Sequence, residues 1–208
     1  AEAYNNLGLA YAACGQYVEA IKAYQSALNL DHYMAEAYYN LGRSYYAVRQ
    51  YPEAIKAYKT AIPLNPGFAP SYNSLGITYN TTGQYSEAIK AFETAISLDS
   101  GFASAYNNLG NAYLALTRYA EAIEAYQTAI GLNSNDVDFH YNIGVVYSRM
   151  KQYQQAIAAF REANRINPHY ADAHNALEQV LAAVEKRTQQ IQNNKEWLKS
   201  HPHAVNVY

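Results

Sequence analysis

A chain of 208 residues with a formal net charge of −2 and a pI of about 6.3 argues against a dedicated nucleic-acid binder, which usually carries a basic stripe. No apolar segment is long enough to cross a bilayer, so we expect no direct membrane insertion. The single cysteine, Cys14, excludes an internal disulfide bond and favours the reducing cytoplasm without fixing the compartment.

One stretch of the sequence occurs in five similar copies. The first copy reads AEAYNNLGLAYAACGQYVEAIKAY and the second reads AEAYYNLGRSYYAVRQYPEAIKAY. The copies begin at Ala1, Ala35, Ala69, Ala103 and Val137, each 34 residues after the last. A fixed period of this length predicts a solenoid over residues 1–168, in which each repeat packs mainly on its neighbours. Because the chain starts in register with a repeat and without an initiator methionine, we expect a fragment or a processed chain.

Each repeat predicts two helices. In the first copy, apolar and small residues follow the i, i+3, i+4, i+7 spacing of a helical stripe from Tyr4 to Tyr11. Gly15 then interrupts the pattern, and a second stripe runs from Tyr17 to Leu28. The sequence therefore predicts an all-α fold of antiparallel helix pairs joined by short turns.

Small residues recur as regularly as large ones. The eighth position of every copy is glycine: Gly8, Gly42, Gly76, Gly110 and Gly144. A glycine inside a helix costs about 1 kcal/mol relative to alanine. Its recurrence indicates that the backbone of another helix approaches closely at this position, while aromatic residues at positions 4, 11, 17 and 24 fill the space between helices.

The full pattern resembles a known family. Aromatic-x-x-Leu-Gly-x-x-Tyr, followed by alanine, an aromatic residue and alanine over 34 residues, resembles the tetratricopeptide repeat. The resemblance covers residues 1–168, with His140 replacing the usual aromatic residue in the fifth copy. It implies a right-handed α-solenoid, a superhelix of antiparallel helix pairs whose concave groove usually binds ligands.

A sixth copy begins at Ala171 but is incomplete. It has Glu178 in place of the glycine, and no second helix of the repeat follows. A helical stripe continues instead, so we predict a C-terminal capping and extension helix over residues 169–199. Residues 200–208 are predicted to be a flexible tail.

Asparagine recurs on the face that the resemblance places in the concave groove. A carboxamide offers both donors and an acceptor, so a ladder of them can pair with a peptide backbone. The ladder resembles that of the superhelical repeats of protein O-glycosyltransferases. The alternative is a scaffold role, in which these amides bond to a neighbouring helix. The candidate ligand-binding residues of this kind are Asn6, Asn40, Asn73, Asn107, Asn108, Asn111 and Asn142.

Tyr39, Arg43 and Tyr46 are a sharper candidate for the same face. Two aromatic rings and an arginine have the composition of a binding hot spot. Tyr141 and Arg149 form a smaller copy of this group. The alternative is simple surface filling in a protein with 23 tyrosines.

Catalysis is not indicated. The sequence has no phosphate-binding loop, nucleophile elbow or zinc signature, so we predict no enzyme, no cofactor and no metal site. The leading hypothesis is a non-catalytic protein-protein interaction scaffold that binds an extended peptide or a partner helix. The alternatives are a module that self-assembles into a homo-oligomer through its terminal helix or repeat ends, and the substrate-recognition arm of a larger enzyme such as a protein glycosyltransferase.

Overall fold

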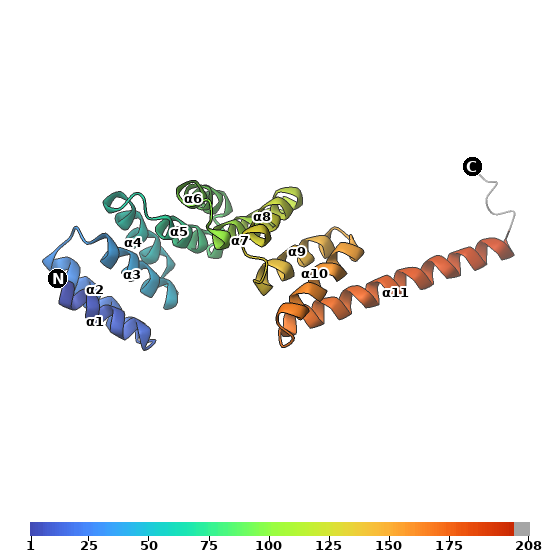
Figure 1. The fold of residues 1–208 in the computed structure, drawn as a ribbon, viewed down its shortest axis with the longest axis horizontal. Coiled ribbons are helices and arrows are strands. Elements are labelled where there is room, and N and C mark those ends of the chain that lie inside the picture. Colours follow the sequence, from blue (N-terminus) through green and yellow to red (C-terminus); the bar gives the residue numbers. More distant parts are fainter. Residues whose placement is uncertain (202–208) are drawn as a thin grey trace. The chain divides into compact units, whose positions relative to one another are not determined.

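A computed structural model describes residues 1–201, and these residues form helices joined by short turns, with no strand among them (Figure 1). The expected all-α class is therefore confirmed. Of the tail predicted over residues 200–208, residues 202–208 lie outside the described part. The helices are α1 (Glu2–Ala13), α2 (Tyr17–Leu30), α3 (Ala35–Ala47), α4 (Tyr51–Leu64), α5 (Ala69–Thr81), α6 (Tyr85–Leu98), α7 (Ala103–Ala115), α8 (Tyr119–Leu132), α9 (Val137–Arg149), α10 (Tyr153–Ile166) and α11 (Ala171–Ser200).

The chain divides into two compact units. The first, Ala1–Asn133, holds α1 to α8 as four helix pairs, and the second begins at Ser134 and holds α9 to α11. In the first unit, the second helix of each pair packs on the first helix of the next, while α1, α3, α5 and α7 contact one another in succession. The first helices therefore form one layer of this unit and the second helices the other. In the second unit, α9 pairs with α10, and α11 packs on both.

The turn inside each pair has the same geometry in every repeat. Its fifteenth position has a positive φ, which is 73° at Gly15 and 77° at Gly83. Arg49, Thr117 and Lys151 adopt the same conformation with φ values of 62°, 58° and 60°. A side chain in this region is strained, and a β-branched threonine more than most. Packing of the two helices therefore imposes this turn even where the local residue disfavours it.

The glycine at repeat position 8 lies under an aromatic ring. A Cβ atom added to Gly76 would lie 2.6 Å from the Cε1 atom of Phe92, a side chain that is fully buried. The other four copies repeat this arrangement with rings at Tyr24, Tyr58, Tyr126 and Phe160. The predicted close approach is present, but the approaching group is the position-24 ring of the same repeat and not a helix backbone. The ring spans the pair and is buried because the glycine leaves room for it.

We expect Gly76→Ala to destabilise the protein by about 1–2 kcal/mol, because overpacking against Phe92 outweighs the gain in helix propensity. Chemical denaturation monitored by circular dichroism measures this difference. Gly131→Ala is the matched control, since no atom lies within 4 Å of a Cβ built at that helical position. The control should be neutral or more stable by up to about 1 kcal/mol. Equal stability of the two variants would contradict the packing role of the position-8 glycine.

Candidate functional site

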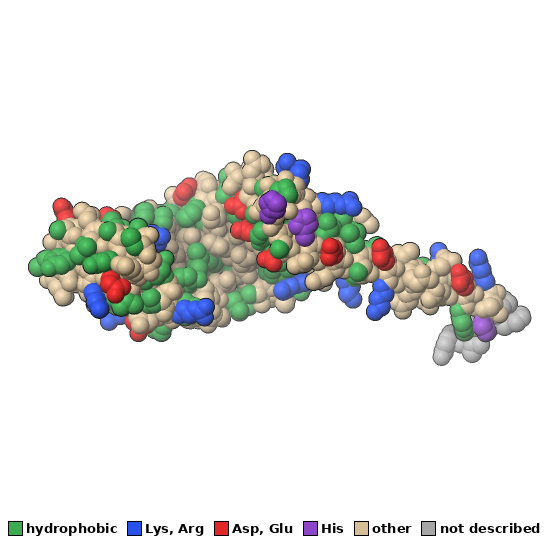
Figure 2. All heavy atoms as spheres, turned by 90° about the horizontal axis from the view of Figure 1, so that it is seen from below, with side chains coloured by type: hydrophobic (Ala, Val, Ile, Leu, Met, Phe, Trp, Pro, Cys, Tyr) green, Lys and Arg blue, Asp and Glu red, His purple; other side chains and the backbone are tan. Residues whose placement is uncertain are grey.

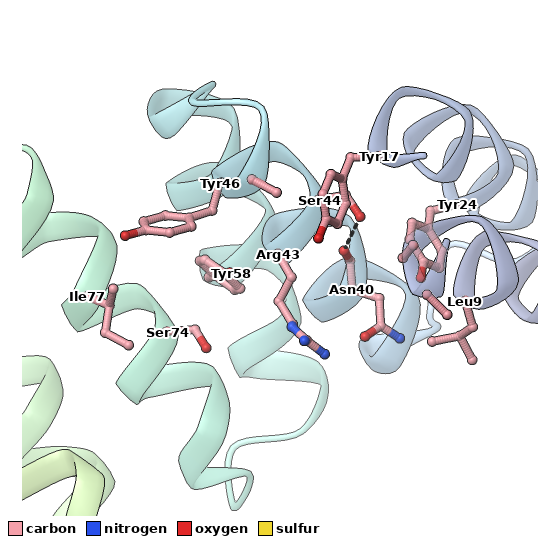
Figure 3. A pocket seen from close by; sticks show the side chains of 13 residues that line it. Leu9, Tyr17, Tyr24, Asn40, Arg43, Ser44, Tyr46, Tyr58, Ser74 and Ile77 are labelled. Carbon is pink, nitrogen blue, oxygen red and sulfur yellow. Dashed lines mark hydrogen bonds between the residues drawn. The ribbon is translucent and has the colours of Figure 1, made fainter. Parts of the chain in front are cut away.

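Two adjoining cavities follow α3 in the first unit. The larger has a volume of about 490 Å³ and lies between α1, α3 and α5, where Figure 3 shows Asn40 and Arg43 leaving α3 on the same side. The smaller, of about 360 Å³, shares Leu9 and Asn40 with the larger. We call the two cavities together the α3 groove. Beyond the shared residues, its main lining side chains are Glu36, Tyr39, Phe68 and Ser71 in the smaller cavity and Arg43, Tyr46, Tyr58, Ser74 and Ile77 in the larger.

The aromatic part of the groove is built around Tyr39. Its ring meets Phe68 edge to face, with 5.2 Å between ring centroids and an interplanar angle of 87°. The guanidinium carbon of Arg43 lies 5.8 Å from the centroid of the same ring. Arg43 is exposed, and no ion pair involves it within residues 1–201. Its charge is therefore free to meet an anionic group in the groove.

Asn40 and Tyr46 complete the group. Asn40 is only 6% exposed, and its backbone carbonyl accepts a hydrogen bond from the Ser44 hydroxyl at 3.0 Å. Its carboxamide lines both cavities and has no hydrogen-bond partner among the described residues. The Tyr46 hydroxyl lies 3.1 Å from the hydroxyl of Thr81. The fold thus brings four of the predicted site residues, Tyr39, Asn40, Arg43 and Tyr46, to one groove.

Other predicted asparagines have partners inside the scaffold. Asn73 is 8% exposed, and its Oδ1 accepts a hydrogen bond from the Asn108 Nδ2 at 3.1 Å. Asn111 accepts a hydrogen bond from the Tyr126 hydroxyl at 2.7 Å. Asn107 is also buried. The predicted alternative, in which these amides bond to a neighbouring helix, therefore describes Asn73, Asn108 and Asn111.

Two further asparagines of the predicted ligand-binding set also make interactions. Another asparagine of that set is exposed to solvent. Asn107 and Asn142 each have an interaction partner. Asn6 is exposed on α1.

The α3 groove lies where this amide bridge is missing. The bridge joins position 5 of one repeat to position 6 of the next, as in Asn73 and Asn108. At the junction of the second and third repeats the same positions are Tyr39 and Ser74. Ser74 instead forms a hydrogen bond with Tyr58, which opposes the rise in the pKa of the Tyr58 hydroxyl that burial causes. Because serine is shorter than asparagine, space remains between α3 and α5.

Sequence reasoning missed several residues that line the groove. Glu36 and Leu9 lie at repeat positions 2 and 9, and Phe68 and Ser71 flank the start of α5. Ser74 carried a signal in the sequence, since it is the one copy that lacks asparagine at position 6. The spacing of one helix cannot reveal which neighbouring helix supplies the opposite wall.

The second unit has a cavity of its own, of about 480 Å³, between α9, α10 and α11. Tyr141 and Arg149 both line it, together with Gln179 and Val180 of α11. The Tyr141 ring meets Tyr170 edge to face at 5.5 Å. The smaller predicted group is therefore brought together as well, in a cavity closed on one side by the terminal helix.

Comparison with known proteins places the chain in a family. The model of the family described as cilia and flagella-associated protein 70 C-terminal domain, a tetratricopeptide-repeat model, matches residues 1–203. The chain belongs to this family. No relative was found among curated proteins.

Solved structures of tetratricopeptide-repeat proteins share the fold. MamA has a TM-score of 0.72 and 27% identity, with 79% of this chain and 96% of MamA covered. YrrB, described as a TPR protein with an unusual peptide-binding site, has a TM-score of 0.70 and 23% identity, with 84% and 90% covered. TTC0263, a thermophilic TPR protein from Thermus thermophilus, has a TM-score of 0.69 and 20% identity, with 87% and 98% covered. These similarities confirm the expected α-solenoid, and with the family they support a role in protein interaction.

The described residues hold no group suited to metal chemistry and no candidate membrane span. Within residues 1–201, no three His, Cys, Asp or Glu side chains come together as a metal site would require. None of the helices in that part combines the length and hydrophobicity needed to cross a bilayer. The α3 groove presents an exposed guanidinium, an aromatic wall and a carboxamide without a partner among the described residues.

We expect Asn108→Ala to destabilise the protein by about 1–3 kcal/mol, because it leaves the buried Oδ1 of Asn73 without its donor. The same substitution in an Asn73→Ala background should cost much less, and denaturant titration of the four proteins gives the coupling energy. Asn6→Ala is the control, since Asn6 is exposed, and should stay within about 0.5 kcal/mol of the parent. Purely additive effects would contradict the bridge.

Proposed function

We propose that the chain is a non-catalytic interaction scaffold whose α3 groove binds an extended segment of a partner protein. The observation that carries the proposal is the Asn40 carboxamide, which lines both cavities and lacks a partner among the described residues. A carboxamide that faces a cavity without a protein partner can donate to and accept from the backbone of a ligand. Tyr39 and Arg43 beside it supply the aromatic and cationic contacts that dominate binding energies.

An extended ligand fits the groove better than a helical one. An α-helix with its side chains is about 10–12 Å wide and uses its own backbone groups internally. An extended segment leaves its N–H and C=O groups free. Asn40, Ser71 and Ser74 place polar side chains along the two cavities, which suits an exposed backbone. The peptide-binding site in the description of YrrB supports the same class of ligand.

We expect Asn40→Ala to weaken peptide binding about tenfold while leaving the melting temperature nearly unchanged, because the lost carboxamide has no partner in the described part of the fold. The probes are peptides selected from a random library displayed on phage, and fluorescence anisotropy measures their dissociation constants. Asn29→Ala, on the exposed surface of α2 and outside both cavities, is the control and should bind as the parent does. Equal affinity of the Asn40→Ala variant would remove the groove as the binding site.

Self-association is a second candidate, supported by the distal half of α11. All residues from Glu185 to Ser200 are exposed. Ile191 and Leu198 are 46% and 45% exposed, and they follow Val184 at seven-residue intervals, which is the repeat of one of the two apolar positions in a coiled-coil heptad. Figure 2 shows polar and charged side chains along this part of the helix, with hydrophobic side chains and a histidine near its end. Such a stripe suits pairing with the same helix of a second copy.

Deleting residues 195–208 should then lower the mass of the assembly, measured by light scattering, by more than the mass of the deleted residues. Ile191→Lys in the full chain should have the same effect, because it places a charge in the middle of the stripe. An unchanged mass in both proteins would reject self-association through α11 and would leave the proposal for the α3 groove untouched.

A further inference from the structure

The α3 groove carries opposite charges at its two ends. Glu36 lines the smaller cavity and Arg43 the larger, and both side chains are exposed on α3. Seven residues correspond to nearly two helical turns, so the two side chains lie on one face about 10 Å apart along the helix axis. The ion pairs of the described chain, Arg118 with Glu121 and Arg165 with Glu162, involve neither of them.

An aromatic ring and a carboxamide line the groove between the two charged side chains. Tyr39 and Asn40 lie between Glu36 and Arg43 in the sequence and line the groove with them. Leu9 of α1 borders both cavities and is 37% exposed. A ligand that follows α3 therefore meets an anionic side chain, then an apolar surface with the Asn40 carboxamide, and then a cationic side chain.

We propose that the α3 groove selects peptides that carry a basic and an acidic side chain three residues apart. This proposal rests on the proposed function and specifies its ligand. A polyproline-II backbone rises about 3.1 Å per residue with three residues per turn, so side chains at i and i+3 share a face and stand about 9 Å apart. That spacing matches the separation of Glu36 and Arg43 along α3. The basic side chain then meets Glu36 and the acidic side chain meets Arg43.

The polyproline-II conformation of the peptide also suits hydrogen bonding to the Asn40 carboxamide. A polyproline-II segment makes no internal hydrogen bonds, so its backbone can donate to and accept from the Asn40 carboxamide. Exposed charges contribute selectivity and register more than raw affinity. A peptide with two like charges at this spacing places one of them against a groove residue of the same sign. The charges therefore fix which segment binds and in which direction it runs.

The test selects a phage-displayed library of random decapeptides on two proteins. One is the parent chain, and the other carries Glu36→Lys and Arg43→Glu, which reverse the charge order without changing the net charge. The parent should enrich opposite charges three residues apart in one order, and the reversed protein should enrich the opposite order. Synthetic peptides from the parent selection should bind the reversed protein about tenfold more weakly by fluorescence anisotropy.

A control variant separates a site effect from a general effect of charge. Glu87→Lys with Lys90→Glu reverses two exposed charges on α6, outside the groove, and should keep the parent's preference. Selected peptides that depend on Asn40 but carry no charge pattern, or the same pattern from both proteins, would overturn this inference and leave the proposed function standing. Selection that yields no Asn40-dependent peptide would overturn both.

Discussion

The geometry of every repeat follows from one contact, between the position-8 glycine and the position-24 ring. This contact fixes the separation of the two helices in every repeat, because a Cβ atom would overlap a buried ring, as between Gly76 and Phe92. With that distance set, the turn between the helices is set too, and even Thr117 adopts a positive φ there. The first helices of the first unit then line up in one layer, which gives position 5 of one repeat a neighbour at position 6 of the next.

In this layer, position 5 of one repeat and position 6 of the next either join the repeats or leave space between them. At Asn73 and Asn108 the two amides bridge the repeats. At Asn5 and Asn40, which are both asparagine as well, no such hydrogen bond forms, and the Oδ1 of Asn5 is buried without a partner among the described residues. Where they are Tyr39 and Ser74, the bridge is absent, and a groove lies between α1, α3 and α5. The regular repeat thus stabilises the array, and the departure from regularity provides space, an aromatic wall and a free charge. The α3 groove thus lies between first helices that no amide bridge joins among the described residues.

The sequence was enough to predict the helices, the pairing and the importance of the glycines, because each depends on local spacing repeated five times. It did not identify the ring over Gly76, since the spacing of small residues does not say whether a backbone or a side chain fills the space beside them. Nor could it separate asparagines in the scaffold from Asn40, because that distinction depends on contacts between repeats. Glu36 was missed because a solvent-facing charge near the start of a helix has many ordinary explanations. The loss of asparagine at Ser74 was the signal that marked the groove.

Restoring the bridge would show whether the groove depends on its absence. A variant with Tyr39→Asn and Ser74→Asn places at the second junction the amide pair found at Asn73 and Asn108. Titrating it with a peptide selected on the parent chain, while recording its melting curve, measures both uses of these positions. We expect the variant to melt at or above the parent's temperature and to have lost its affinity for the peptide. Parental affinity in a variant that folds normally would contradict the claim that the groove exists because the bridge is missing.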